Sequence, residues 1–341
     1  MWEEIKRLMP VTNDWIYLST FEEAALPVVS GRKMSQLIRL QVENGVSKPP
    51  PRRDVREQIA KRISNLLGSG RKAGVFPFWN KGQAISFLLS LTNLPSGADV
   101  ISNHEVLLDK SFNIIEVDTY LSPEILIGAI TSNTKLVFIQ DIDIKSGIRS
   151  PLGELAAICQ RHGILFMVDC SYSVGVLEIL PEELNIDLMV FDGSKWLLGP
   201  SNCVYAYVSD QHPKLRAKGT NLIESDLTNT TSVMEVGMYY SLRLLNQYSI
   251  QDIQNYVLLL TDQLAAGISE LNYDLVSSRD SSNRSAMVYF TRADMEAVEL
   301  RDRLLLEGIT SGVMGDCNVL SPHIFITSQE IDRTLDILAN I

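Results

Sequence analysis

Two residues of opposite charge, Lys195 and Asp169, stand where they could do chemistry together. Asp169 ends the apolar run of residues 164–168, and Lys195 follows the apolar run of residues 188–191 after a short turn. In an open α/β sheet, ligands bind outside the carboxyl ends of the strands. We therefore expect the carboxylate and the amine to face one crevice.

A lysine that forms a Schiff base and an aspartate on the pyridinium nitrogen are what pyridoxal 5′-phosphate (PLP) requires of a protein. The lysine amine must be neutral near pH 7, which burial and nearby positive charge favour. The aspartate keeps the ring nitrogen protonated because an opposite charge stabilises the charged form. Lys195 is thus the predicted Schiff-base lysine and general acid/base, and Asp169 the predicted partner of the ring nitrogen. Taken singly, the two residues would be read as a surface lysine and a helix N-cap.

Two further segments match other parts of such a cofactor. Gly82 and Gln83 lie in a turn just before the apolar run of residues 85–89, and a helix N-terminus offers N–H donors to a phosphate. His104 follows an apolar run, and its flat ring is expected to stack on the cofactor. The alternatives are an ordinary turn before a helix and a histidine satisfied at a strand end.

The elements needed to position these residues follow an alternating pattern. Strand-like and helix-like segments alternate between residues 55 and 210, which predicts a mainly parallel sheet with helices on both faces, an α/β/α sandwich. The expected helices start near Arg56, after Ser122-Pro123 and after Ser150-Pro151, with Gly163 ending the last. The expected strands contain residues 100–101, 136–139, 164–168, 188–191 and 204–208.

The C-terminal third of the chain has a different texture, which predicts a second, smaller α+β unit. Helices are expected over residues 236–245 and 253–271, and strands over residues 286–290 and 323–326. Thr327 and Glu330 form a capping box ahead of a last amphipathic helix. The predicted division is an N-terminal segment of residues 1–30 packed on the small domain, a large cofactor-binding domain of residues 31–235 and a small domain of residues 236–341.

Composition disfavours several classes of function. The 341 residues are 45% hydrophobic and carry a net charge of −11, and such a field repels nucleic acid and anionic lipid. No run approaches the roughly 20 apolar residues of a membrane span, and the N-terminus lacks the apolar core of a signal peptide. Four scattered cysteines without metal spacing predict reduced thiols, no metal site and a cytoplasmic protein. A nicotinamide-dependent oxidoreductase is disfavoured because no glycine fingerprint follows the first strand.

Several motifs match one pattern in order along the chain: Ile16-Tyr17-Leu18, residues 94–100, Asn103-His104-Glu105, residues 161–169, residues 193–200 and residues 328–338. Together they resemble the fold-type I PLP enzymes, specifically the class V aminotransferase and cysteine desulfurase family. The resemblance implies a two-domain fold, a bound PLP and a homodimer with its active site at the subunit interface.

Some positions depart from the family pattern. Tyr172 replaces a glutamine, and its hydroxyl is expected to bond the cofactor's phenolic oxygen. Ser194 replaces a histidine before the lysine and is expected near the phosphate. Ile144 replaces an asparagine that contacts the ring. Leu227 displaces the threonine that reaches the phosphate of the other subunit, unless a register slip lets Thr228 serve.

The largest departure concerns the arginine that holds the substrate carboxylate in relatives. It should precede Ser321, yet Val319-Leu320 contains none. Arg243, Arg284 and Arg292 are available elsewhere, and no pattern selects one. Cys317 is a candidate desulfurase nucleophile, but it lies almost next to the missing-arginine position and not on a longer upstream loop, so a buried thiol is the preferred interpretation.

The sequence therefore predicts a PLP enzyme that acts on a small amino-group-bearing molecule, with transamination as the default reaction. Lyase, epimerase or desulfurase chemistry on the same scaffold stays open, because fold does not fix reaction. The other alternative is a PLP-fold protein that has lost turnover and binds a ligand. It is motivated by the missing arginine, by Ile144 and by Leu227.

Overall fold

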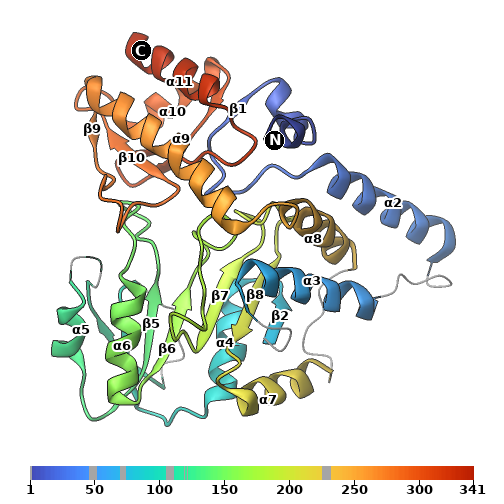
Figure 1. The fold of residues 1–341 in the computed structure, drawn as a ribbon, viewed down its shortest axis with the longest axis vertical. Helices are drawn as coiled ribbons and strands as arrows, with labels where there is room; N and C mark the ends of the chain where they lie inside the picture. Colours follow the sequence, from blue (N-terminus) through green and yellow to red (C-terminus); the bar gives the residue numbers. More distant parts are fainter. Residues whose placement is uncertain are drawn as a thin grey trace.

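A computed structural model describes residues 2–45, 52–69, 74–104, 111–118, 120, 122–224 and 232–341. A large sheet flanked by helices forms one half of the molecule, and a smaller unit of helices and short strands lies at its end (Figure 1). The predicted α/β/α architecture with a smaller α+β unit is therefore observed.

The large sheet has seven strands in the order β2-β8-β7-β6-β5-β3-β4. Neighbours from β7 to β4 pair in parallel, and β8 is antiparallel to both β7 and β2. Consequently β2 points the same way as β7, and their carboxyl ends lie at one edge. The strands are β2 (Gly74–Phe78), β3 (Asp99–Ser102), β4 (Asn113–Glu116), β5 (Thr134–Gln140), β6 (Leu165–Asp169), β7 (Leu188–Asp192) and β8 (Val204–Val208).

Helices cover both faces of this sheet because alternate strand residues point to opposite sides. Leu136 and Phe138 pack toward α4 in one core, whereas Val137 and Ile139 belong to the core on the other face. The helices of this half are α3 (Arg52–Leu66), α4 (Lys81–Thr92), α5 (Glu124–Ala129), α6 (Leu152–His162) and α7 (Pro213–Glu224).

Local signals account for where the site-forming helices begin and end. The side chain of Asn80, the N-cap of α4, accepts a hydrogen bond from the Gln83 N–H. Gly163 follows α6 in the left-handed conformation, with φ of 66°, as glycine commonly does after a helix. The predicted end of that helix is confirmed.

The smaller unit is built on a four-stranded antiparallel sheet in the order β12-β13-β10-β9. The capping box predicted at Thr327 and Glu330 is present at the start of α11. The elements are α9 (Ile250–Glu270), β9 (Asp274–Leu275), β10 (Val288–Thr291), α10 (Ala297–Leu306), β12 (Gly312–Met314), β13 (Cys317–Leu320) and α11 (Ser328–Asn340).

The strand predicted over residues 323–326 is wrong. Pairing with β10 belongs to β13, which ends at Leu320, and residues 323–326 form a buried loop. The His323 ring bonds the Trp196 carbonyl oxygen at 3.0 Å and accepts the Ile324 N–H. Its apolar neighbours are therefore buried by packing and not by strand pairing.

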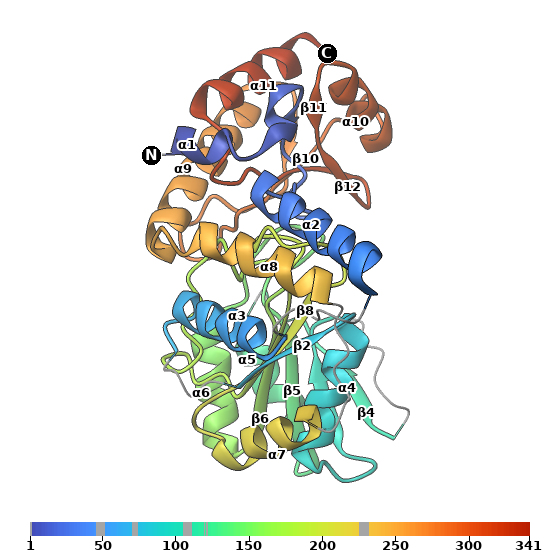
Figure 2. The ribbon, with the colours of Figure 1, turned by 90° about the vertical axis from the view of Figure 1, so that its right-hand side faces the viewer.

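The N-terminal segment runs along the smaller unit before the chain enters the large one. Strand β1 pairs in parallel with β11, and Lys6 forms a 2.7 Å ion pair with Glu330 of α11. Figure 2 shows α2 lying against α8, between the two halves. The domain boundaries at residues 30 and 235 stay predictions. The elements are α1 (Trp2–Lys6), the 3₁₀ helix at Pro10–Asn13, β1 (Ile16–Tyr17), α2 (Val28–Asn44), α8 (Ser232–Leu245) and β11 (Ile309–Thr310).

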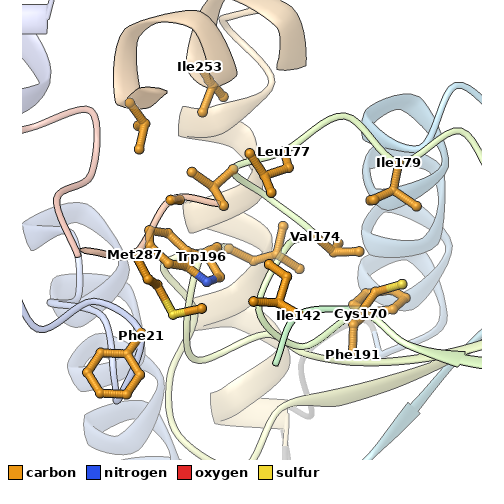
Figure 3. Packing of buried hydrophobic residues seen from close by; sticks show 14 of the residues in the cluster. Phe21, Ile142, Cys170, Val174, Leu177, Ile179, Phe191, Trp196, Ile253 and Met287 are labelled. Atoms are coloured by element: carbon orange, nitrogen blue, oxygen red, sulfur yellow. The ribbon is translucent and has the colours of Figure 1, made fainter. Parts of the chain in front are cut away.

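The core near the predicted active-site lysine contains side chains from both halves. Trp196, which is fully buried, belongs to one apolar cluster with Phe21 and Met287, and they lie close together in Figure 3. Gly175 has a φ of 107°, and a Cβ there would lie 2.6 Å from the Trp196 carbonyl oxygen. This packing fixes the backbone next to Lys195.

Candidate active site

The parallel strands bring the chemically active side chains to one edge of the large sheet. Asp169 ends β6 and Asp192 ends β7, and the turn that carries Lys195 follows directly. Strand β2 ends at the same edge, so Lys81 at the start of α4 joins them. Asp169 and Lys195 therefore face a common region.

Asp169 is a buried carboxylate whose two oxygens are both bonded. Oδ1 accepts from the Ser171 N–H at 3.0 Å and from the Ser171 hydroxyl at 2.5 Å. Oδ2 lies 2.7 Å from the Lys81 Nζ. Burial raises the pKa of Asp169, but the Lys81 charge and these hydrogen bonds outweigh burial, so the pKa lies below its usual value. The carboxylate is thus held ionised beside a cation.

The amine of Lys195 lies beneath the N-terminal segment. Nζ donates to the carbonyl oxygens of Phe21 at 2.5 Å and Glu22 at 2.9 Å, and it lies 5.0 Å from the centroid of the Tyr172 ring. Burial lowers the pKa of Lys195. The neutral, nucleophilic form of this amine is therefore reached at lower pH than for an ordinary lysine.

His104 and Tyr172 lie within electrostatic reach of the same charges. The pKa of His104 is lowered by burial and by Lys81, against the opposing effect of Asp169. Its ring packs edge-on against Phe138, with centroids 5.0 Å apart. Burial raises the pKa of Tyr172, which keeps its hydroxyl protonated. Stacking by His104 and the phenolic contact of Tyr172 stay predictions.

The turn predicted to hold the phosphate is the N-terminus of α4. Gln83 N–H is bonded to Asn80, and Gln83 Oε1 accepts from Trp79 N–H at 3.3 Å. Gly82 belongs to the first turn, where N–H groups have no partner within the helix. Ser194 follows β7 at the same edge, and its N–H and hydroxyl both donate to Asp192 Oδ1. Phosphate binding by Gly82, Gln83 and Ser194 stays a prediction.

Sequence reasoning missed four residues that contribute to this site. Lys81 was not singled out, because the strand before it was not predicted and the direction of its side chain has no sequence signal. Asp192 also had a signal, because it ends the strand before Lys195. The carbonyl oxygens of Phe21 and Glu22 had none, since a contact between segments so far apart in sequence needs the folded chain.

In this chain the region just before and at Ser321, where relatives have a substrate-binding arginine, binds the N-terminal segment instead. The Ser321 hydroxyl donates to the Leu18 carbonyl oxygen at 3.1 Å and accepts the Phe21 N–H at 3.0 Å. Ser321 thus fastens the segment that binds Lys195. Of the arginines considered, Arg284 pairs with Asp262 and Arg292 pairs with Asp294. Both are therefore engaged elsewhere on the smaller unit.

The residues present fit PLP. A buried carboxylate that needs a cationic partner already has one in the Lys81 ammonium, which stands where a protonated ring nitrogen would be stabilised. A lysine amine of lowered pKa and the first turn of α4 lie at the same edge. Asp169 would pair with the ring nitrogen, Lys195 would carry the cofactor, and α4 would face the phosphate.

Three further predictions concern the phosphate contact of Leu227 or Thr228, a metal site and a membrane-spanning helix. Leu227 and Thr228 lie outside the described residues. In the described part of the chain, no group of three or more His, Cys, Asp or Glu side chains is arranged to hold a metal ion. Within the same residues, no helix combines the length and apolar character needed to cross a membrane.

Comparison with known proteins places this site in a family. The family model for class-V aminotransferases matches residues 111–316. Cysteine desulfurase IscS of Mannheimia succiniciproducens is 26% identical over 259 residues, which are 68% of this chain and 62% of that protein. The L-cysteine desulfhydrase-like protein lolT1 of Epichloe uncinata is 35% identical over 78 residues, 23% of this chain and 17% of that protein. The chain thus covers less than two thirds of the length of these relatives.

Solved structures share the fold at low sequence identity. The cystine C-S lyase C-DES, in complex with its reaction product cysteine persulfide, has a TM-score of 0.83 and 15% identity, and the match covers 98% of this chain and 99% of that one. Cysteine desulfurase CsdA of Escherichia coli has a TM-score of 0.81 and 14% identity over 100% of this chain and 98% of that one. A C-DES variant has glycine covalently linked to its PLP cofactor.

The match to the family model extends over more than half of the chain and includes both Asp169 and Lys195. The predicted family, the predicted fold and the predicted cofactor are confirmed. The chain belongs to the class-V aminotransferase family of PLP-dependent enzymes.

Proposed function

We propose that this protein is a PLP-dependent C–S lyase, which eliminates a sulfur-bearing group from the β-carbon of a small amino acid. The observation that carries the proposal is the Lys195 amine of lowered pKa at the same sheet edge as the buried Asp169. Relatives and structural neighbours named as cysteine desulfurases, a desulfhydrase-like protein and a C-S lyase support a sulfur-containing substrate.

Lys195 is the proposed base for the elimination. PLP, when bound, supplies an electron sink that acidifies the substrate α-proton. Lys195 Nζ accepts this proton, and the electron pair left behind forms a Cα=Cβ bond. The Cβ–S bond breaks in the same direction, and the sulfur group leaves with its electron pair. Asp169 contributes by stabilising positive charge at the ring nitrogen.

The cysteines favour elimination over sulfur transfer to the protein. All four lie in the described part of the chain; Cys159, Cys170 and Cys203 are buried, and Cys317 is half-buried. Burial raises the pKa of each thiol. A thiol that accepts sulfur must ionise readily and be accessible. An elimination needs no such thiol, because the sulfur group leaves with its own electrons.

The proposed substrate pocket lies beside His104. A cavity of about 620 Å³ is lined there by His104, Tyr120, Asp143 and neighbouring residues, a size that suits a small ligand. Its lining includes one cation, Lys145, and the carboxylates of Glu116, Asp118 and Asp143, which outnumber it and favour an amine-bearing substrate. No arginine is among the described lining residues, consistent with the changed position before Ser321.

Product analysis tests the proposed reaction. The PLP-loaded protein should convert cystine or cysteine into keto acid, ammonia and a persulfide or sulfide in equal amounts. A variant with all four cysteines changed to serine should keep this activity within about threefold, while Lys195→Ala should lose it. Alanine formation that disappears in the cysteine variant would establish a desulfurase instead.

The remaining outcomes also have clear meanings. Amino-group transfer to an added keto acid, without release of sulfur, would establish the aminotransferase expected by default from the sequence. Racemisation of the substrate without release of sulfur would indicate an epimerase. A cofactor band that no amino compound in a broad panel bleaches would favour a binding protein that has lost turnover.

A homodimer is the proposed assembly. Ile38, Leu40 and Val42 of α2 are 50%, 45% and 81% exposed, and apolar side chains grouped on one exposed segment favour a protein interface. Light scattering coupled to size-exclusion chromatography tests this assembly. A monomer mass near 38.1 kDa at micromolar concentration would contradict it.

A further inference from the structure

Lys81 is a second lysine at the cofactor site, and neither the family pattern nor the proposed reaction gives it a role. It is the first residue of α4, and its Nζ lies 2.7 Å from Asp169 Oδ2. Asp169 is 1% exposed, so a buried carboxylate is neutralised by an ammonium from another element. Burial favours the neutral form of Lys81, but Asp169 more than compensates and raises the pKa of Lys81.

The Lys81 ammonium stands in the region that the cofactor ring must enter. Its charge acts on His104, Tyr172 and Lys195 as well as on Asp169. These are the residues assigned to the ring face, the phenolic oxygen, the covalent link and the ring nitrogen. An ammonium on Asp169 and a protonated ring nitrogen compete for Oδ2, because Oδ1 already accepts two hydrogen bonds from Ser171.

We propose that Lys81 is a cofactor-binding residue with two positions: the counter-ion of Asp169 in the cofactor-free protein, and a ligand of the PLP phosphate in the loaded protein. The inference rests on the PLP cofactor and not on the reaction assigned above. In this arrangement Asp169 has a cationic partner both without the cofactor (Lys81) and with it (the ring nitrogen). Asp169 is never left as an unpaired buried charge, which is costly.

The second position follows from where Lys81 is attached. Its backbone belongs to the first turn of α4, whose N-cap is Asn80 and whose free N–H groups favour an anion. A flexible lysine side chain rooted in that turn can turn from Asp169 toward a phosphate at the same helix end. Phosphate carries close to two negative charges at neutral pH, so it attracts the ammonium as the ring nitrogen takes Asp169.

Comparing PLP with pyridoxal, which lacks the phosphate, isolates this role. Binding of each is measured by equilibrium dialysis and by the visible absorption of the bound cofactor. In the natural protein, we expect pyridoxal to bind poorly because Lys81 gains no phosphate contact by leaving Asp169. In Lys81→Met, the competitor of the ring nitrogen and the phosphate ligand are both gone. The preference for PLP over pyridoxal should then fall by at least roughly tenfold, the value of one charge-assisted hydrogen bond.

Two further variants keep the test independent of folding defects. Lys81→Arg retains the positive charge and should retain most of the preference. Lys61→Met, in an exposed position on α3, is the matched control and should change nothing. The cofactor-free Lys81→Met protein should also melt at a lower temperature than the natural one, and adding Asp169→Asn should recover most of that loss.

Three outcomes of these binding measurements would contradict the proposed role of Lys81. An unchanged PLP-to-pyridoxal preference in Lys81→Met, with both ligands bound, would overturn the role of Lys81 and leave the cofactor assignment intact. Binding of PLP by Lys81→Met but not by the natural protein would show that Lys81 blocks the site, which also contradicts the proposal. Failure of every variant to bind PLP would remove the cofactor itself, and this inference with it.

Discussion

The amine of Lys195 and the carbonyl oxygen of Phe21 lie 2.5 Å apart. This contact joins the predicted active-site lysine to an N-terminal segment that Ser321 holds in place through the Phe21 N–H. Segments from both ends of the chain therefore meet at the lysine. The N-terminal segment is therefore part of the site. Lys195 Nζ must break its hydrogen bonds to the carbonyl oxygens of Phe21 and Glu22 before it can bind a cofactor.

The first prediction concerns the reactivity of Lys195. Burial lowers the pKa of this amine below the ordinary value of lysine, and only a neutral amine attacks an acylating reagent. We expect Lys195 in the cofactor-free protein to be modified at a lower pH than the lysine of a short unstructured peptide added to the same sample. Mass spectrometry of peptides labelled across a pH series measures both midpoints. Equal midpoints would contradict the expected lowering.

The second prediction concerns the charge of Asp169. Asp169→Asn keeps the size of the side chain but removes the charge that stabilises a protonated ring nitrogen. We expect kcat of the cofactor-saturated enzyme to fall by about 10²–10³, the range seen when one electrostatic contact is lost from an active site. Asp99→Asn, at the amino end of β3, is the control. A kcat within a few-fold of the natural value would rule out this role of Asp169.

The third prediction concerns the pH dependence of stability through Asp141. Burial raises the pKa of this carboxyl to about 7, against the lowering effect of its hydrogen bond from Ser173. An unfolded aspartate has a pKa of about 3.9. The folded state therefore retains a proton that the unfolded state loses, and the free energy of unfolding decreases between about pH 4 and pH 7.

Asp141→Asn removes this titration and can still accept from Ser173. We expect its melting temperature to fall less than that of the natural protein between pH 5 and pH 8. Asp336→Asn, in an exposed position on α11, should behave like the natural protein. Parallel melting curves for Asp141→Asn and the natural protein across this range would contradict the assignment.

The fourth prediction concerns the backbone beside Lys195. Gly175 has a φ of 107°, and an alanine Cβ there would lie 2.6 Å from the Trp196 carbonyl oxygen. We expect Gly175→Ala to destabilise the protein by about 1–3 kcal/mol, a typical cost of local backbone strain. Chemical denaturation measures the change. Gly128→Ala, on α5 with nothing within 4 Å of the new Cβ, should have no destabilising effect.

Much of the large sheet could be predicted from the sequence. The apolar runs at residues 164–168, 188–191 and 204–208 became β6, β7 and β8 with shifts of at most one residue. These strands are buried on both faces, so their sequences are continuously apolar and easily recognised. Strand β2 was missed because it contains Pro77, which is tolerated there only because β2 lies at the edge of the sheet.

Only those site residues that directly follow the end of a predicted strand could be identified from the sequence. Asp169 and Lys195 followed from their positions after two neighbouring strands. The contact of Lys81 with Asp169 depends on the direction of a side chain at the start of a helix, and no sequence period specifies that direction. The loop at residues 323–326 looked like a strand because packing against Trp196 and pairing in a sheet both select apolar residues.

The central claim is that Lys195, and not Lys81, binds the cofactor covalently. The test is to load the natural protein with PLP, record its visible absorption, reduce it with borohydride and map the modified peptide by mass spectrometry. We expect an absorption band that Lys195→Ala lacks, and a pyridoxyl group on Lys195. A pyridoxyl group on Lys81, or a band that persists in Lys195→Ala, would contradict the account.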